Sequence, residues 1–230
     1  MKPQLGLLII LTATVPALGT PYWIAWEGDD FPENQGWTRN WGNYQGQYQG
    51  DGAIRTLEDG ILTYDSLFDV GVCDFSFIEM PGQLDPDPGE VLVMEWRLKV
   101  DELVGWSQYD PGVAVKSDEA WVMGLGFAVD QVLSVFEHGV SAPITPGVFH
   151  SYVLRSPDMR TYELFIDGEL ALEGVFVPRA MSSYVGWGDS VQGAASLHHW
   201  DYFRFGVVAP EPGSILLVGA LLVCCGRRRA

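Results

Sequence analysis

Residues 149–175 constrain the fold more than any other part of this chain. They contain two strand-like runs, His150–Arg155 and Thr161–Ile166, and a third short run, Glu169–Leu172. In the second run apolar and polar side chains alternate, which is the two-residue period of a strand with one buried face. Asp167-Gly168 follows and supplies a two-residue turn whose positions tolerate positive φ, a strong hairpin signal. The stretch therefore predicts an antiparallel meander.

Runs of the same kind recur along the rest of the chain. We expect strands at Tyr22–Glu27, Gly52–Leu57, Gly60–Tyr64, Asp69–Glu79, Glu90–Val100, Gly112–Lys116, Ala120–Ala128, Gln131–Glu137, Tyr184–Trp187 and His199–Val208, with a long loop after the first. On the polar face of one of them, Glu95, Arg97 and Lys99 are expected to form a solvated charged row. No stretch has a convincing helical pattern. Short strands bounded by turns predict an all-β fold, an antiparallel β-sandwich or barrel.

The charge of the chain limits its partners. It carries 30 acidic and 13 basic residues, which gives a formal net charge of −17 at pH 7. Such a surface repels phosphate backbones and anionic lipid, so nucleic acid is not an expected partner. It suits divalent cations or neutral partners such as polysaccharide. The plainer interpretation of the charge is solubility outside the cell.

The first residues have the pattern of a targeting signal. Lys2 is followed by a mostly apolar run from Leu5 to about Val15, and small residues stand at Ala17 and Gly19. This order is typical of a secretory signal peptide, so residues 1–19 are predicted to be one, cleaved near Gly19. We therefore expect the protein to be exported.

Residues 209–230 have the pattern of a second targeting signal. Three parts follow one another: the triplet Pro210, Glu211 and Pro212, the apolar run Ile215–Val223, and the cluster Arg227, Arg228 and Arg229. This order resembles the PEP-CTERM sorting signal of Gram-negative bacteria. The resemblance implies export, transient membrane contact through the tail, and cleavage near Pro-Glu-Pro by an exosortase-type enzyme. It also implies delivery to the cell surface or extracellular matrix.

The length of the apolar run leaves an alternative open. Residues 214–225 would form about 18 Å of helix, against a hydrocarbon core of about 30 Å. The arginine cluster fits the positive-inside rule for a tail on the cytoplasmic side. A simple C-terminal anchor is therefore the alternative to a cleaved signal. Between the two targeting signals, residues 20–208 form the predicted single domain, whose one cysteine, Cys73, allows no disulfide framework.

Several stretches of this domain carry a further resemblance. Phe149-His150-Ser151-Tyr152 is an aromatic-His-aromatic strand, and the next strand ends in Asp167-Gly168. The strand Val93–Val100 and the closing run Trp200–Phe205 fit the same pattern. Together they resemble the concanavalin A-like lectin/glucanase domains, including laminin-G-like domains. The resemblance implies a two-sheet jelly roll, an antiparallel β-sandwich, but no activity.

Catalytic carboxylates are not recognisable. Retaining glucanases of this fold carry a Glu-x-Asp-x-x-Glu pattern, because acid and nucleophile must lie roughly 5–5.5 Å apart. The nearest groupings here are Glu163 with Asp167 and Asp167 with Glu169, and Asp167 is better explained as a turn residue. Tandem histidines at 198–199 point to opposite faces of a strand, so at most one could act beside Asp201. No catalytic residue is assigned, and the chain is interpreted as a non-enzyme.

A structural Ca²⁺ is the cofactor that the resemblance implies. Lectins and glucanases of this fold often bind one between the first and last strands. The matching positions here are Glu27, Gly28 and Asp201. Ca²⁺ prefers carboxylate and carbonyl oxygens, which these residues supply. Our hypothesis is that they hold one ion.

Aromatic residues are the candidates for ligand binding, because aromatic faces stack on sugar rings. Trp37, Trp41, Tyr44 and Tyr48 lie in a Gly- and Gln-rich region and are expected to be exposed. The alternative is that the tryptophans belong to the core, as Trp96 does on the apolar face of its strand. The sequence thus predicts an exported, non-catalytic surface or matrix protein that binds glycan. A glycoside hydrolase or lyase, and a structural coat component without a small ligand, remain alternatives.

Overall fold

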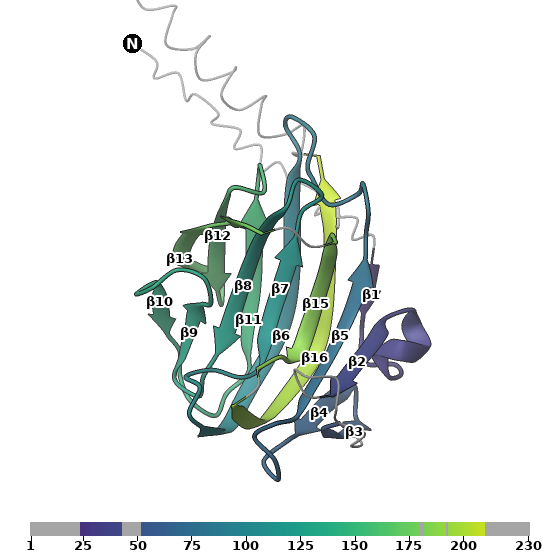
Figure 1. The fold of residues 1–230 in the computed structure, drawn as a ribbon, viewed down its shortest axis with the longest axis vertical. Coiled ribbons are helices and arrows are strands. Elements are labelled where there is room, and N and C mark those ends of the chain that lie inside the picture. Colours follow the sequence, from purple (N-terminus) through teal and green to yellow (C-terminus); the bar gives the residue numbers. More distant parts are fainter. Residues whose placement is uncertain (1–23, 43–51, 180–181, 192, 210–230) are drawn as a thin grey trace, which may run out of the picture.

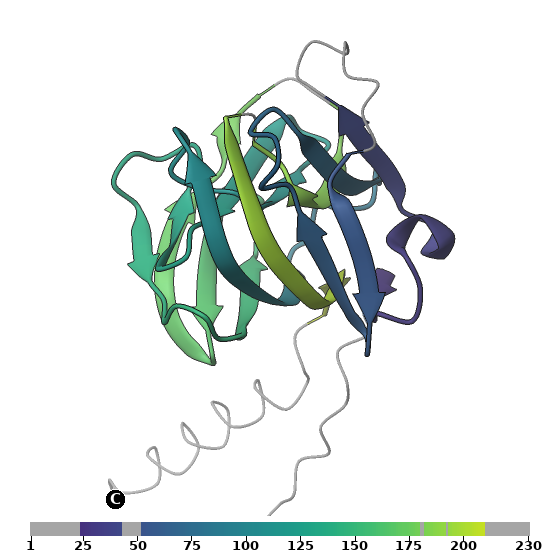
Figure 2. The same cartoon turned by 90° about the horizontal axis from the view of Figure 1, so that it is seen from below.

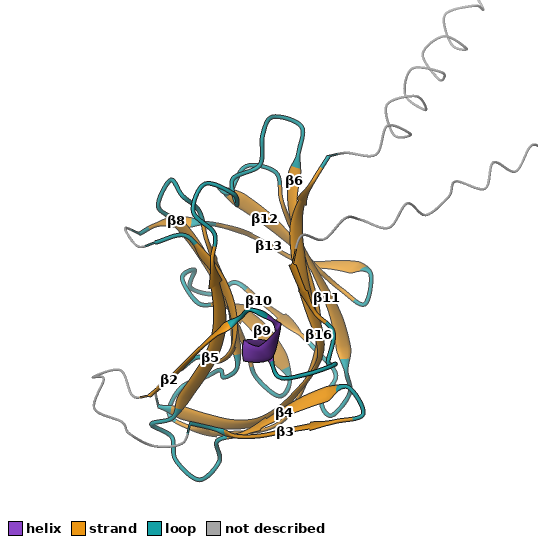
Figure 3. Cartoon of the chain, turned by 90° about the vertical axis from the view of Figure 1, so that its right-hand side faces the viewer, coloured by secondary structure: helices purple, strands orange, loops and turns teal. Residues whose placement is uncertain are grey.

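The chain folds into two antiparallel β-sheets that face each other, as Figure 1 shows and Figure 3 shows from the side. This structure is a computed structural model, and it describes residues 24–42, 52–179, 182–191 and 193–209, without the side chains of 41–42. It confirms the predicted two-sheet β-sandwich. Among the described residues the helical element is the 3-10 helix η1 (Pro32–Gln35), and no helix there is long and apolar enough to span a membrane.

We call the sheet with the two longest strands sheet A. Its strands are β1 (Ile24–Trp26), β3 (Ile54–Glu58), β4 (Ile61–Asp65), β6 (Val91–Gly105), β11 (His150–Ser156), β12 (Thr161–Ile166), β13 (Glu169–Val175) and β16 (Ala194–Val208). They lie in the order β13-β12-β11-β6-β16-β4-β3, and β1 pairs with β16.

The other sheet is sheet B. Its strands are β2 (Thr38–Gly42), β5 (Cys73–Glu79), β7 (Gly112–Lys116), β8 (Trp121–Phe127), β9 (Gln131–Ser134), β10 (Ser141–Pro143), β14 (Val177–Pro178) and β15 (Tyr184–Asp189). They lie in the order β10-β9-β8-β7-β15-β5-β2, and β14 pairs with β8.

The long strands β6 and β16 form the middle of sheet A and pair along almost their whole length. Figure 2 shows them side by side, with β16 in lime. The predicted meander of β11, β12 and β13 is confirmed, but it forms one side of the sheet rather than its centre. Pairing between β6 and β16 joins segments far apart in the chain, so no local signal reveals it.

Local signals set several boundaries correctly. β7 and β12 have the predicted bounds, and the turns Asp59-Gly60 and Asp167-Gly168 have positive φ at both residues, as type I′ hairpins require. The expected long loop after the first strand is wrong, because it contains β2. That strand has no apolar alternation, since its inward side chain, Arg39, pairs with the buried carboxylate of Asp74. Pairing with β5 makes this segment a strand.

Aromatic side chains from both sheets fill the space between them. Trp187 of β15 stacks on Phe203 of β16, with ring centroids 5.5 Å apart, and also contacts Trp26 and Trp200. These side chains are fully buried. Burying a large apolar side chain contributes roughly 1.5–3 kcal/mol, so this cluster fixes the two sheets against each other. Each sheet then presents one outer face to solvent.

Candidate functional site

The outer face of sheet B has a centre without large side chains. Strand alternation turns Val113, Val115 and Trp187 into the core and their neighbours outward. At two adjacent rungs of β8, β7 and β15 every outward residue is glycine or alanine: Gly126, Gly112 and Gly188 on one, Gly124, Ala114 and Gly186 on the next. We call these six residues the glycine floor. Glycine has no side chain of its own, so rings and ligands can approach the backbone closely at these positions.

Aromatic side chains from β5 rest on one side of the glycine floor. A Cβ atom at Gly186 would lie 2.2 Å from Cε1 of Phe75 and 3.1 Å from Cβ of Phe77. The ring of Phe77 contacts that of Tyr184 edge to face, with centroids 6.5 Å apart. The glycine is therefore required for the ring of Phe75 to lie where it does.

Two more rings lie on the opposite side. A Cβ atom at Gly126 would lie 2.2 Å from Cδ2 of Tyr109, and one at Gly124 would lie 3.0 Å from Cε2 of Phe136. The five rings of this face, which are Phe75, Phe77, Tyr109, Phe136 and Tyr184, are all half-buried. Half-exposed rings held by backbone can offer a ligand a large contact without first being ordered.

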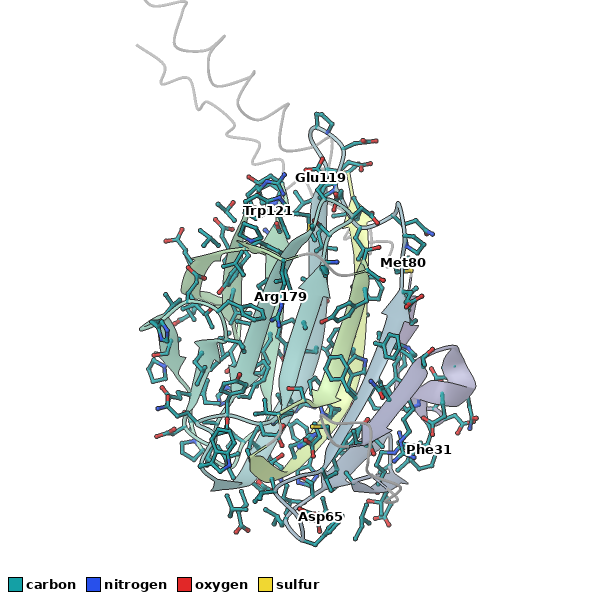
Figure 4. The ribbon with its side chains drawn as sticks, in the orientation of Figure 1. Phe31, Asp65, Met80, Glu119, Trp121 and Arg179 are labelled. Atoms are coloured by element: carbon teal, nitrogen blue, oxygen red, sulfur yellow. The ribbon has the colours of Figure 1, made fainter. Side chains whose placement is uncertain are left out.

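The charged groups of this face are cations on its central strands and a carboxylate on β5, the exposed Glu79, which pairs in register with Tyr184. Among the outward residues of β7, β8 and β15 none is a carboxylate, and one is Lys116. Arg179 reaches over the same face, where Figure 4 shows it in front of β7 and β8, with its Cζ atom 5.6 Å from the ring of Phe136. Chemically, the face offers apolar stacking surface and positive charge.

The outer face of sheet A has a different character. Its charged side chains pair with one another: Arg204 with Glu95 at 3.1 Å, Arg97 with Asp201 at 2.5 Å, and Lys99 with Asp101 at 2.8 Å. This confirms the charged row expected on β6. The row is exposed to solvent on one side, and its charged side chains are engaged in ion pairs.

Two carboxyl groups are enclosed between the sheets. Asp189 follows Gly188 in β15, and both it and Asp110 are fully buried. Asp110 accepts hydrogen bonds from the Ser196 hydroxyl at 2.7 Å and from the Ser190 backbone N–H at 3.0 Å. Burial raises the pKa of Asp110 to about 6, and burial together with Asp110 raises the pKa of Asp189 well above its usual value. The pair binds a proton at a pH at which surface carboxyls have none.

A serine and a histidine continue this buried network. The Ser196 hydroxyl lies 2.8 Å from Nδ1 of His198, whose ring stacks on Tyr64. Burial lowers the pKa of His198 well below its usual value, so the imidazole is neutral. The arrangement is not a catalytic triad, because Ser196 bridges Asp110 and His198 and all three side chains are closed off from ligand.

A pocket of about 580 Å³ opens beside β10, β11 and β13, and His150 and Asp167 are among the residues that line it. Nδ1 of His150 lies 2.6 Å from Oδ2 of Asp167, and Nε2 lies 3.0 Å from the carbonyl oxygen of Thr145. The other oxygen of Asp167 accepts the backbone N–H of Ser151 at 2.9 Å. Both ring nitrogens are used, so His150 ties a turn and a loop to β11, as expected of a packed, hydrogen-bonding strand residue.

The predicted ligand-binding aromatics are placed as follows. The expectation that Trp37 is exposed is wrong: its side chain is 3% exposed and contacts Trp187 and Phe203 edge to face. The turn after η1 directs it into the core. Trp41 belongs to β2, but its side chain, like Tyr44 and Tyr48, lies outside the described residues, and their role stays a prediction.

The sorting-signal residues also lie outside the described residues. They are Pro210, Glu211, Pro212, Arg227, Arg228 and Arg229.

The predicted calcium ligands are engaged with arginines. Asp201 pairs with Arg97 at 2.5 Å, and a carboxylate oxygen of Glu27 lies 3.8 Å from Arg204. Gly28 has positive φ, and a Cβ atom there would lie 2.1 Å from the carbonyl oxygen of Gly60, so a close backbone contact accounts for this glycine. In the part of the chain that the structure describes, no three His, Cys, Asp or Glu side chains are grouped around one metal position. An ion bound here would compete with two guanidinium groups.

The rings on the glycine floor were missed by the sequence analysis, although a signal exists. Gly124-Leu125-Gly126 and Gly186-Trp187-Gly188 each place glycine at two positions spaced by two residues, in or next to a predicted strand. Glycine weakens a strand, so glycines spaced by two residues indicate a close approach of other groups. Which rings approach, however, depends on the pairing of strands.

Comparisons with known proteins agree on the fold. No protein-family model and no curated protein matches the sequence. Among solved structures, a carbohydrate esterase from the Shiga toxin-encoding bacteriophage phi24B is similar with a TM-score of 0.59 and 9% identity, over 84% of this chain and 100% of that one. An endo-1,3-beta-glucanase from Streptomyces sioyaensis is similar with a TM-score of 0.52 and 12% identity, over 86% and 100%. At these identities the likeness concerns the jelly-roll fold alone.

Proposed function

We propose that this chain is an exported, non-catalytic protein that binds polysaccharide on the outer face of sheet B. The observation that carries the proposal is the set of half-exposed aromatic rings supported by the glycine floor. Sugar rings present apolar C–H faces that stack on aromatic rings. A set of rings held in place before binding costs little conformational entropy when a sugar chain is bound.

The same fold occurs in proteins named for carbohydrates, a carbohydrate esterase and an endo-1,3-beta-glucanase. Binding is favoured over hydrolysis because a retaining hydrolase needs two carboxyl groups roughly 5–5.5 Å apart beside the sugar. On this face the outward residues of the described strands β7, β8 and β15 include no carboxylate, and β5 adds a single one, Glu79. Asp110 and Asp189 are carboxyls close to the floor, but they face the core.

The position of the two ends of the domain bears on how it would be delivered. β1 begins opposite Phe205, near the end of β16, so both ends of the domain lie in sheet A. A signal peptide and a sorting tail joined there would leave sheet B facing away from both junctions. We propose that the protein is delivered to the cell surface or matrix in this way. Mass spectrometry of the secreted protein would identify its two ends, and retention of residues 210–230 would favour the anchor.

The binding test uses the purified protein on a polysaccharide panel in affinity electrophoresis, with calcium and with chelator. Tyr184→Ala and Phe136→Ala remove rings from sheet B, and Phe165→Ala removes a half-buried ring from the outer face of sheet A. Base–aromatic stacking is worth about 1–3 kcal/mol per ring in nucleic acids, and by analogy we expect each sheet B variant to weaken binding about tenfold. The sheet A variant should bind like the parent protein.

Two outcomes would replace this proposal. Release of reducing ends from a bound polysaccharide would favour a glycoside hydrolase, and release of unsaturated sugars would favour a lyase. No binding to any polysaccharide, with or without calcium, would favour the structural coat component.

A further inference from the structure

Lys116 is the one cation among the outward residues of the described central strands of sheet B. Val115 belongs to the core, so alternation turns Lys116 to the outer face, next to Ala114 of the glycine floor. It pairs in register with Tyr184 on one side and with Val122 on the other. The side chain has no exposed surface, and its Nζ atom has no hydrogen-bond partner.

A second cation stands at the same end of the floor. The backbone N–H of Arg179 donates to the carbonyl oxygen of Ala120 at 2.6 Å, which continues the pairing of β14 with β8 and holds the chain beside the start of β8. The guanidinium lies over the ring of Phe136, and its charge acts on the hydroxyl of Tyr184. Lys116 and Arg179 therefore both lie near Tyr184.

Neither cation has a carboxylate partner among the described residues. Asp118 is the acidic group that acts on Lys116, but its carboxylate accepts the backbone N–H of Gly82 at 2.8 Å. Burial lowers the pKa of Lys116, because a covered ammonium without a partner is costly in its charged form. An anion placed between the two cations would remove that cost.

The absence of a carboxylate partner for Lys116 and Arg179 is unusual in a chain of this composition. Acidic residues outnumber basic ones 30 to 13, so carboxylate partners are abundant. On sheet A, Arg97, Lys99 and Arg204 each pair with one, whereas Arg155 lies against the ring of Phe165. Two cations near Tyr184 without a carboxylate partner, on the face that carries the rings, point to a ligand that supplies the negative charge.

We propose that the polysaccharide bound on the glycine floor is acidic, with uronate residues whose carboxylates pair with the exposed Arg179 and with Lys116, whose covered ammonium must turn outward to reach them. The inference rests on the proposed function and names the ligand class for the same face. A guanidinium recognises a planar carboxylate through two parallel N–H groups, and an ammonium adds a point charge. The net negative charge of the chain opposes a polyanion at long range. At 0.15 M salt this repulsion is screened beyond about 8 Å, whereas contact pairs persist.

The probes are sodium polygalacturonate and its carboxyl-reduced form, which differ in charge but share the sugar backbone. Binding of the full chain to each is measured by affinity electrophoresis at 0.15 M salt. The variants are Arg179→Gln and Lys116→Gln. The matched control is Arg155→Gln, because Arg155 lies on the outer face of sheet A with its Cζ atom 5.5 Å from the ring of Phe165.

We expect the parent chain to bind polygalacturonate at least tenfold more tightly than the reduced polymer. Arg179→Gln and Lys116→Gln should abolish that preference, while Arg155→Gln keeps it. Arg179 is exposed, so its variant tests the inference even if Lys116→Gln fails to fold. Equal binding of both polymers, unchanged by either variant, would overturn the acidic-ligand inference and leave polysaccharide binding intact. Failure to bind any member of the wider panel would overturn the proposed function as well.

Discussion

The outer faces of the two sheets follow the same alternation of side chains, yet they differ in what they leave unpaired. On sheet A, Arg97 pairs with Asp201 and also lies 4.8 Å from the ring of Phe149, so charge and ring cover each other. On sheet B, the rings rest on glycine, and Lys116 has no partner. On sheet A the charged side chains pair with one another, whereas on sheet B the rings are half-exposed and Lys116 has no partner.

This difference separates two uses of a β-sheet surface. A face whose charges pair internally is well solvated and offers a ligand little, because each new contact must displace an existing one. Rings and a cation without partners gain from a ligand without such a loss. The comparison therefore supports the proposal that sheet B, rather than sheet A, is the binding face, and three measurements test it.

The largest expected effect is the pH dependence caused by the carboxyls beneath the glycine floor. Burial raises the pKa of Asp110 from 3.8 to about 6, so folding favours the protonated form. This contribution to stability is complete below 3.8 and is lost as the pH rises through about 6. One pKa unit corresponds to about 1.36 kcal/mol, so we expect the free energy of unfolding to fall by roughly 3 kcal/mol between about pH 4 and pH 7.

Sheet A should respond with the opposite sign. Burial by itself would raise the pKa of Asp101, but the hydrogen bonds from Lys99 and His199 outweigh burial, so the pKa lies below its usual value. Its contribution is present above its usual pKa and is lost as the pH falls. Urea unfolding followed by tryptophan fluorescence would measure both effects. Asp189→Asn, whose amide can donate to Asp110, should remove at least half of the dependence between pH 4 and 7, and a parent stability that rises over this range would contradict the assignment.

The next effect comes from filling the floor. A Cβ atom at Gly186 meets the ring of Phe75 at 2.2 Å, so Gly186→Val must displace that ring. Overpacking of this kind costs about 1–3 kcal/mol, and we expect polysaccharide binding to weaken at least tenfold. Ala25→Val adds two methyl groups on the outer face of sheet A, opposite Arg204, and should change stability by less than about 0.5 kcal/mol. Equal effects of the two variants would erase the distinction between the faces.

The smallest effect is expected for the ion pairs of sheet A. A double-mutant cycle of Arg97→Gln and Asp201→Asn should give a coupling energy of about 0.2–1 kcal/mol, because the pair is partly exposed. A coupling above about 2 kcal/mol would show that this face is a structural centre rather than a solvated row.

The same variants test the calcium hypothesis. Calorimetric titration of the chelated protein with Ca²⁺ should give heat that Asp201→Asn abolishes and Arg97→Gln increases, since the guanidinium competes for that carboxylate. Absence of both heat and stabilisation in the parent protein would end the hypothesis for Glu27, Gly28 and Asp201.

The amino-acid sequence determined the features that depend on neighbours along the chain. Alternation identified most of the strands, β7 and β12 to the residue but not β2, β10 or β14, and Asp167-Gly168 fixed the hairpin after β12. These features are local because a strand's period and a turn's φ angles depend on a few consecutive residues.

Tertiary structure decided the features that join distant residues. Trp37 entered the core, β2 formed on β5, and β6 met β16 in the middle of sheet A through contacts that no local pattern contains. The candidate site has the same origin. Its glycines were visible in the sequence, but the rings of Phe75 and Phe136 reach them only because the strands pair in one register. Side-chain pairing across a sheet is set by that register, and the register is a property of the whole fold.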